Sequence, residues 1–161
     1  MGPASIEVEI IVESALDAAS VAGGAAPERV PPAGLPADGF AAGALDEAKA
    51  RRLCALAAAS AGVRDGHVAI VFVDAARIAA LNSEHRDRPQ PTDVLSFPID
   101  EAAPLHGVPR ELGDVVICPA HTRDLYEAVL HGVLHLLGMD HERDAGEMLA
   151  LQAELLRWET L

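Results

Sequence analysis

The sequence is poor in aromatic residues, in cysteine and in positive charge. Its 161 residues include three Phe, one Tyr, one Trp and two Cys, and 12 Lys and Arg stand against 25 Asp and Glu, for a formal net charge of −13. So few cysteines exclude a small scaffold held by disulfides. The acidic balance argues against general nucleic-acid binding, which usually depends on a basic surface. Any nucleic-acid contact must therefore be local, in a basic cleft on an acidic body.

Long apolar runs are also missing. No window approaches the roughly 18 apolar residues that a membrane-spanning helix needs, and the first twenty residues do not resemble a signal peptide. We therefore expect a cytoplasmic protein without membrane contact. In that compartment Cys54 and Cys118, which form no Cys-x-x-Cys pair, are predicted to be free buried thiols, with a disulfide between them as the alternative.

Hydrophobic periodicity predicts a mixture of strands and helices. A period of two over Ile6 to Val12 indicates a half-buried first strand. The fold class is predicted to be α+β with mixed α/β layers, in one domain over 1–161, with a mixed sheet of about four strands packed by helices. Further strands are expected at 67–73, 94–97 and 114–118, and helices at 44–61, 75–83, about 122–137 and from 144 onward.

Loops are predicted from proline and glycine. Residues 18–39 are rich in Pro, Gly and Ala and are expected to form a flexible loop or linker within the one domain. Two prolines exclude regular helix at 86–91, so a loop is expected there. Pro98 is expected to end the strand before it, and a polar loop is expected to follow as far as Leu112.

Capping residues predict where the helices begin and end. Asp74 is the expected N-cap of the helix 75–83, and Thr122 that of the helix that stops at Gly138, with Asp124 in its first turn. The last helix has capping-box spacing at its start. Its residues at the box are Asp144 and Glu147, and its expected apolar face consists of Met148, Leu151, Leu155 and Trp158.

Three of the seven histidines, His131, His135 and His141, lie within one short stretch. A spacing of four places His131 and His135 on one helical face with Cβ atoms about 5–6 Å apart. A turn at Gly138 would let His141 fold back beside them. The pattern predicts one zinc ion per chain at the end of a helix, with nickel, copper and iron as alternatives. Three protein ligands leave a fourth position open, as in catalytic zinc sites. Surface histidines on an amphipathic helix are the competing interpretation, which the surrounding apolar residues disfavour.

The same stretch argues against a zinc peptidase. Those enzymes need Glu directly after the first His of the helix as general base. Here that position is Gly132, and no carboxylate on the same helical face replaces it.

Three sequence blocks resemble a known family. The run His-Gly-Val-Leu-His-Leu-Leu-Gly-Met-Asp-His at 131–141 fits the signature of the YbeY family of bacterial endoribonucleases, also called rRNA maturation factors. Two earlier blocks match in family order, and the resemblance covers about residues 66–158. These blocks are Leu81-Asn82 with Arg86 and the run from Pro91 to Pro98, and the run from Leu112 to Ile117.

The resemblance implies a single-strand-specific, metal-dependent endoribonuclease that acts in small-subunit rRNA 3′-end maturation and ribosome quality control. It implies a four-stranded mixed sheet, the three histidines as metal ligands and Arg86 as the functionally essential arginine of the cleft. Single-stranded RNA, rRNA and the ribosome or its proteins are the implied partners. The chain departs from the family pattern in its long N-terminal linker and in the short segment 119–130, which is expected to trim the cleft wall near the metal.

The residues themselves suggest roles for an open zinc site. Such a site lowers the pKa of bound water toward ~7 and polarises a phosphoryl oxygen. Arg86 offers a permanently charged planar fork for a phosphate, and His85 and Arg88 complete a small basic patch. Asp114 and Asp140 are candidates to accept a ring N–H from a ligating histidine, and a strand start or a turn is the alternative role of each.

The sequence leaves the roles of several other polar residues open. Thr92, Asp93 and Ser96 are candidate RNA contacts, with turn capping as the alternative for Asp93. The remaining histidines, His67, His106 and His121, are expected to have surface or loop roles.

Two functions from different classes follow from these features. The open ligand position and Arg86 favour a metal-dependent endoribonuclease, a hydrolase of RNA phosphodiester bonds. The acidic charge and the short segment 119–130 favour a ribosome-assembly factor whose zinc is mainly structural. The general base is not identified, and attack by metal-bound hydroxide and attack by the RNA 2′-OH both stay open.

Overall fold

The computed structural model describes residues 5–13, 45–99 and 110–159. The predicted loop at 18–39 lies outside these residues. Strands and helices follow one another in the predicted order. They are β1 (Ser5–Val12), α2 (Glu47–Ser60), β2 (Asp65–Phe72), α3 (Ala75–Arg86), β3 (Val94–Pro98), β4 (Arg110–Ile117), the short 3₁₀ helix η2 (Pro119–His121), α4 (Leu125–Leu136) and α5 (Glu147–Glu159).

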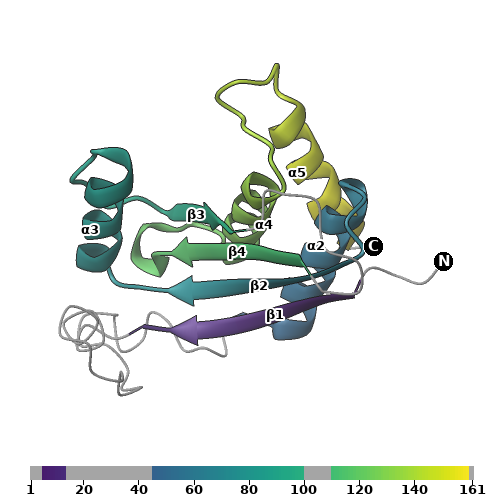
Figure 1. The fold of residues 1–161 in the computed structure, drawn as a ribbon, viewed down its shortest axis with the longest axis horizontal. Helices are drawn as coiled ribbons and strands as arrows, with labels where there is room; N and C mark the ends of the chain where they lie inside the picture. The colour runs from purple at the N-terminus through teal and green to yellow at the C-terminus, as the bar shows by residue number, and fades with distance from the viewer. Residues whose placement is uncertain (1–4, 14–44, 100–109, 160–161) are drawn as a thin grey trace.

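The four strands form one mixed sheet in the order β1-β2-β4-β3 (Figure 1). β1, β2 and β4 are parallel, and β3 is antiparallel to β4 at one edge. β2 and β4 lie inside the sheet and are buried on both faces over much of their length, which explains their nearly continuous apolar sequences. The predicted α+β class with a mixed four-stranded sheet is confirmed.

Two apolar clusters attach the helices to the two faces of the sheet. The larger cluster joins α2, α4 and α5 to one face and includes Val115 and Leu134. The smaller one joins α3 to the opposite face and includes Ile78 and Val116. Neighbouring residues of a strand point to opposite faces, so Val115 and Val116 belong to different clusters. In Figure 1, α2, α4 and α5 gather on the right and α3 lies on the left.

Both cysteines are free and buried, as predicted. Burial raises the pKa of the Cys54 thiol to about 12, so this thiol stays protonated and unreactive. Within the three described stretches, no helix combines the length and the apolar character needed to cross a membrane.

The end of α3 differs from the prediction. Arg86 was expected in a loop, but it is the last residue of α3, and Asp87 ends the helix with a φ of 57°. Aspartate tolerates this left-handed conformation better than most residues, which lets the helix continue until just before Pro89. At the other end the carboxylate of Asp74 accepts a hydrogen bond from the N–H of Arg77, so the predicted cap is confirmed.

The polar loop predicted as far as Leu112 is wrong over its last residues. β4 begins at Arg110 and pairs with β2 from its first residue. Pro98 was predicted to follow the strand and stop it. It is instead the last residue of β3 itself, where it pairs with Gly113 of β4. β3 is an edge strand, where a proline without an N–H is tolerated. The pairing partners therefore decided the strand limits, which local polarity did not reveal.

The N-cap of α4 is Asp124 and not Thr122. The Asp124 carboxylate accepts hydrogen bonds from the N–H groups of Tyr126 and Glu127. The Thr122 hydroxyl donates to the carbonyl of Cys118 instead and closes the η2 turn. Both residue types are good caps, and the extra turn after β4 shifts the helix start to the later one.

Trp158 does not lie on the buried face of α5, where it was predicted. It is 61 % exposed, whereas Met148, Gln152 and Leu155 are buried. Adjacent helical residues point about 100° apart, and Glu159 is the one held against α2, so Trp158 is turned outward.

Gly132 brings α4 close to the sheet. A Cβ built at this position would collide with Cγ1 of Val115, so any side chain here would force α4 or Val115 to shift. The hydroxyl of Ser96 on β3 donates a hydrogen bond of 2.9 Å to the Gly132 carbonyl. The helix that carries two of the candidate metal ligands is therefore held directly on β3 and β4.

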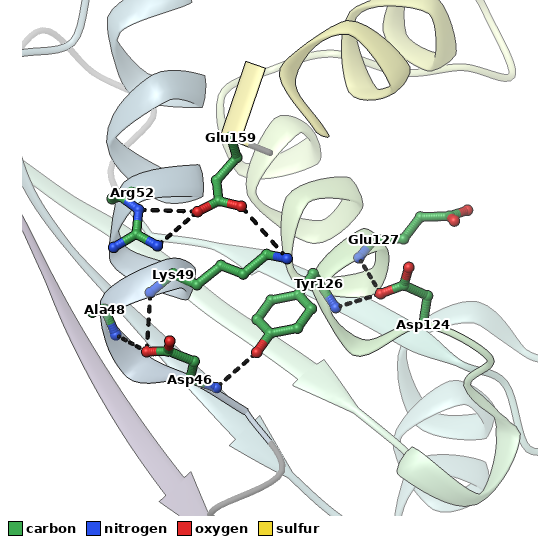
Figure 2. A network of polar contacts seen from close by, with 8 residues as sticks. All are labelled: Asp46, Ala48, Lys49, Arg52, Asp124, Tyr126, Glu127 and Glu159. Carbon is green, nitrogen blue, oxygen red and sulfur yellow. Dashed lines mark hydrogen bonds and ion pairs between the residues drawn. The ribbon is translucent and has the colours of Figure 1, made fainter. Parts of the chain in front are cut away.

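Figure 2 shows the contacts that hold α5 against α2 and α4. Arg52 donates two hydrogen bonds of 3.0 and 2.7 Å to Oε1 of Glu159, and Nζ of Lys49 lies 3.5 Å from the other carboxylate oxygen. The same Nζ lies 4.3 Å from the centre of the Tyr126 ring, whose hydroxyl accepts a hydrogen bond from the N–H of Asp46. The hydrogen bonds from Arg52 are the main reason that the pKa of Glu159 is lowered.

We expect Gly132→Ala to lower the melting temperature because the new methyl group collides with Val115. Overpacking of this kind costs about 1–3 kcal/mol. Thermal unfolding should show that Val115→Ala destabilises the wild type but relieves part of the loss in Gly132→Ala. Strictly additive effects of the two substitutions would contradict the close contact.

We expect Glu159→Gln to lower stability in a pH-dependent way. A carboxyl group whose pKa is lowered by folding stabilises the protein fully above its unfolded pKa of about 4.3, and this contribution disappears as the pH falls through the folded value. Melting curves of wild type and variant should therefore differ near neutral pH and converge in acid. Glu154→Gln, at an exposed position of the same helix, is the matched control and should change little at either pH.

Candidate functional site

The end of α4 forms a compact turn. The N–H of Gly138 donates to the carbonyl of His135 at 3.0 Å, and the N–H of Met139 donates to that of Leu134 at 3.1 Å, which is the pattern of a Schellman turn. Gly138 has a φ of 97°, a conformation that suits glycine. The predicted helix stop at Gly138 is therefore confirmed.

A second turn orients His141. Oδ1 of Asp140 accepts a hydrogen bond of 3.0 Å from the N–H of Glu142, so the residues on both sides of His141 are tied together. The Asp140 carboxylate also lies 3.4 Å from Nε of Arg143. Asp140 thus acts as a turn residue, which was one of its two predicted roles.

The turn brings His131, His135 and His141 together. Their ring centres lie 4.8, 4.9 and 5.2 Å apart, and one ligand atom from each lies within 4.8 Å of the others. All three side chains are half-buried. The two helical histidines project from one face of α4, as their spacing of four predicts.

Hydrogen bonds fix the protonation of the two helical rings. Nδ1 of His135 lies 2.9 Å from the carbonyl oxygen of Met139, and Nδ1 of His131 lies 2.9 Å from Oε1 of Gln152. Both partners are acceptors, so each Nδ1 carries a proton, and each neutral ring has a bare lone pair on Nε2. These two Nε2 atoms face each other at 3.2 Å. Two lone pairs this close repel each other unless the nitrogens share a proton as a hydrogen bond or bind one metal ion.

The separation of these atoms suits a metal ion. Two zinc–nitrogen bonds of about 2.0–2.1 Å at a tetrahedral angle span about 3.3 Å. Burial lowers the pKa of His135, and the neighbouring His131 lowers it further, which favours the neutral form that binds metals. Nδ1 of His141 is buried without a hydrogen-bond partner among the described residues, which is costly for a polar atom. The three residues therefore fit a metal ion.

Gln152 is a candidate site residue that the sequence analysis missed. It is buried on α5, and its side-chain oxygen holds His131 in the tautomer that presents Nε2. Outer partners of this kind orient metal-binding histidines. A signal was present in the sequence, because Gln152 lies between Met148 and Leu155 on the predicted apolar face of the last helix.

Asp114 does not take the position predicted for an outer partner. It lies on β4, where burial is the main cause of its raised pKa; His67 lowers this pKa and Glu111 raises it further. His67 itself lies 2.9 Å from the carboxylate of Glu111 and 3.4 Å from that of Glu9. The rings of His131 and His135 have Gln152 and Met139 as partners instead.

Arg86 shares a hollow with the histidines. This hollow has a volume of 760 Å³, and the triad forms one wall. The opposite wall comes from the end of α3, the following loop and β3. It contains the predicted basic patch and the predicted polar residues, namely His85, Arg86, Arg88, Thr92, Asp93 and Ser96. The tertiary structure thus brings two sequence blocks that are about 45 residues apart into one site.

The polar residues of this hollow have different surroundings. The Ser96 hydroxyl is bound to Gly132, and Oδ1 of Asp93 accepts hydrogen bonds from the N–H of Val94 and the hydroxyl of Thr92. Asp93 therefore caps a turn, as the alternative prediction has it. His121 ends η2 with an exposed side chain, and His106 lies outside the described residues.

An aromatic pair lies beside the basic patch. The ring of His85 meets that of Phe97 edge to face, with 4.8 Å between the centres. His85 is exposed and Phe97 is half-buried, and both line the hollow. The pair places two aromatic rings, inclined at 66° to each other, next to arginine side chains.

Comparisons with known proteins agree with this site. A family model described as Endoribonuclease YbeY matches residues 44–158, which include the triad and Arg86. A protein of that name from Micrococcus luteus is 46 % identical over an alignment of 108 residues, which covers 55 % of this chain and 67 % of the relative. Another from Azorhizobium caulinodans is 41 % identical over 138 residues and covers 74 % of this chain and 85 % of the relative.

A solved structure has a similar fold. The solution structure of a Thermotoga maritima protein superposes with a TM-score of 0.50 at 22 % identity and covers 94 % of this chain and 88 % of that chain. This likeness supports the arrangement of strands and helices alone. The match to the family model and the identity to its members carry the assignment. The chain therefore belongs to the endoribonuclease YbeY family, a family of RNA-cleaving hydrolases.

Proposed function

We propose that this protein is a single-strand-specific endoribonuclease that depends on one zinc ion held by His131, His135 and His141. The observation that carries the proposal is the opposition of Nε2 of His131 and Nε2 of His135 at 3.2 Å in a hollow that also contains Arg86. Neutral imidazoles suit zinc, and three of them leave a coordination position for water or substrate.

The chain's own residues divide the work on an RNA phosphodiester. A bound zinc ion would supply Lewis acidity at the triad. Arg86 would bind the phosphate from the opposite wall and stabilise the charge that develops on its oxygens. Gln152 and the Met139 carbonyl would keep the two helical rings oriented while the substrate changes.

Preference for single strands follows from the shape and lining of the hollow. Proteins that recognise unpaired RNA stack bases on aromatic rings beside cationic groups. The pair of His85 and Phe97 lies on the same wall as Arg86 and Arg88. A base inside a duplex has both faces covered and could not use this surface.

We further propose that the natural substrate is rRNA, that the reaction belongs to maturation of the small-subunit 3′ end and ribosome quality control, and that the protein works in the cytoplasm with the ribosome. Relatives that are 46 and 41 % identical to this chain are named endoribonucleases. The net charge of −13 supports a selective partner, because it discourages binding to arbitrary nucleic acid.

An assembly factor with a structural zinc ion is the second candidate. One observation favours it: the triad joins the end of α4 to the turn that leads into α5, so a bound ion would also stabilise this connection. The two candidates differ in whether the metal-loaded protein cleaves RNA by itself.

We expect His135→Ala to lose both bound metal and cleavage of a single-stranded RNA. Arg86→Glu should keep its metal and lose at least tenfold in cleavage rate, because removing one group that stabilises transition-state charge typically costs 10²–10³. Metal analysis and a cleavage assay on the same samples give both readouts. Arg51→Glu, an exposed position on α2, is the charge-matched control and should resemble the wild type.

The outcomes separate the candidates. Full cleavage by metal-free wild-type protein would contradict a metal-dependent reaction. Normal metal content in a wild-type protein that does not cleave RNA would favour the assembly factor.

We expect Gln152→Leu to weaken metal binding by about 10–100-fold, because His131 loses the acceptor that fixes its tautomer. Gln152→Glu keeps the shape and offers a stronger acceptor. It should bind metal at least as tightly as the wild type, and its melting temperature should rise more on metal addition. Chelator competition measures the affinities. Equal affinities for all three proteins would mean that Gln152 only fills space.

A further inference from the structure

The unpaired arginines of this acidic protein are concentrated at one place. Most arginines in the described ranges contact other residues, as Arg52 does with Glu159 and Arg77 with Glu13. Within those ranges, three guanidinium groups form neither a hydrogen bond nor an ion pair, and they belong to Arg86, Arg88 and Arg123. All three line one of two hollows.

The second hollow lies next to the first, beside the start of α4. It has a volume of 700 Å³ and is lined by η2, the start of α4 and two residues of α5, the exposed Leu149 and the buried Gln152. His131 and Asp93 line both hollows. Arg123, exposed at the start of α4, is the arginine of the second hollow, and Arg86 and Arg88 belong to the first. A metal ion held by the triad would therefore have arginine side chains in both of the hollows that meet at His131.

Arg123 forms no ion pair with the carboxylates that line the same hollow, among the residues that the structure describes. Asp124 accepts two main-chain hydrogen bonds at the start of α4, and Asp93 accepts one from Val94. These hydrogen bonds hold both carboxylates against the main chain, where each keeps its negative charge. Glu127 is the remaining acidic side chain of this hollow, and His121 adds an imidazole.

We propose that a single RNA strand passes through both hollows and crosses the triad, and that the second hollow is a subsite in which Arg123 binds a backbone phosphate. The proposal rests on the proposed endoribonuclease function and extends it. Phosphates on one side of the cleaved bond would contact Arg86 and Arg88, and a phosphate on the other side would contact Arg123. A strand held on both sides of the metal is cleaved within the chain and not at its end.

The short segment 119–130 has a different role from the one that the sequence predicted. The sequence predicted that this segment trims the wall of the cleft. In the structure it forms η2 and the first turn of α4, and these elements line the second hollow. The segment therefore adds a phosphate-binding residue to the side of the triad opposite Arg86.

The test compares Arg123→Ala, Arg88→Ala and the charge-matched control Arg51→Ala, all in the metal-loaded full chain. Binding of a fluorescent single-stranded RNA is measured by anisotropy over a range of salt concentrations. We expect both Arg123→Ala and Arg88→Ala to bind severalfold more weakly. Each should lower the slope of log K against log salt by about 0.7, the value for one phosphate contact on a single strand. Arg51→Ala should match the wild type.

Neutral phosphates then locate each contact along the strand. RNAs that carry one methylphosphonate at successive positions on either side of the cleaved bond are bound to each protein. A position that weakens binding to the wild type but not to Arg123→Ala identifies the phosphate that Arg123 contacts. We expect the positions for Arg123 and Arg88 to lie on opposite sides of the cleaved bond. Bound metal is measured in every variant to exclude an effect through His131.

The results separate this proposal from the proposed function. Normal binding and salt slope for Arg123→Ala in a protein that cleaves RNA would overturn the second subsite and leave the endoribonuclease intact. Arg123 and Arg88 positions on the same side would also overturn the strand path. A wild-type protein that fails to cleave but whose RNA binding depends on Arg123 and Arg88 would support the two-hollow site and contradict the nuclease.

Discussion

The close packing of α4 against the sheet is the constraint on which the site depends. With no side chain at Gly132, the helix can lie against Val115, and the Ser96 hydroxyl binds its main chain from β3. This contact fixes the distance from His131 and His135 to the wall that holds Arg86. The residue type at 132 thus has two consequences: it leaves out the general base of a zinc peptidase, and it sets the depth of the hollow.

The orientation of the histidine rings depends on a second set of contacts. Gln152 faces His131 only if α5 is held in place, and α5 is held by the Glu159 carboxylate between Arg52 and Lys49 (Figure 2). The contacts of Glu159 with Arg52 and Lys49 are therefore linked to the metal site through α5. Such an arrangement keeps a bare lone pair on each Nε2 before any ion binds, which reduces the reorganisation needed for binding.

The distribution of charge reconciles an acidic protein with a polyanionic substrate. Arginines on the body of the protein are engaged with other residues, and those without partners in the described ranges surround the triad. Local charge of this kind supports binding at one place while the net charge repels nucleic acid elsewhere. The predicted conflict between composition and family is therefore resolved by position and not by overall charge.

Features that depend on local spacing were predictable from the sequence. The period of two in β1, the spacing of His131 and His135, the stop at Gly138 and the cap at Asp74 each involve residues within one or two turns, so short-range geometry determines them. The family blocks added Arg86 as a cleft residue.

Features that depend on distant residues were decided by the tertiary structure. Pairing with β2 and β3 set the start of β4, and packing of α5 against α4 placed Gln152 behind His131. The meeting of two hollows at His131 has the same origin, because η2, α5 and the loop after α3 converge there only through the folded core, whose contacts no short stretch of sequence encodes.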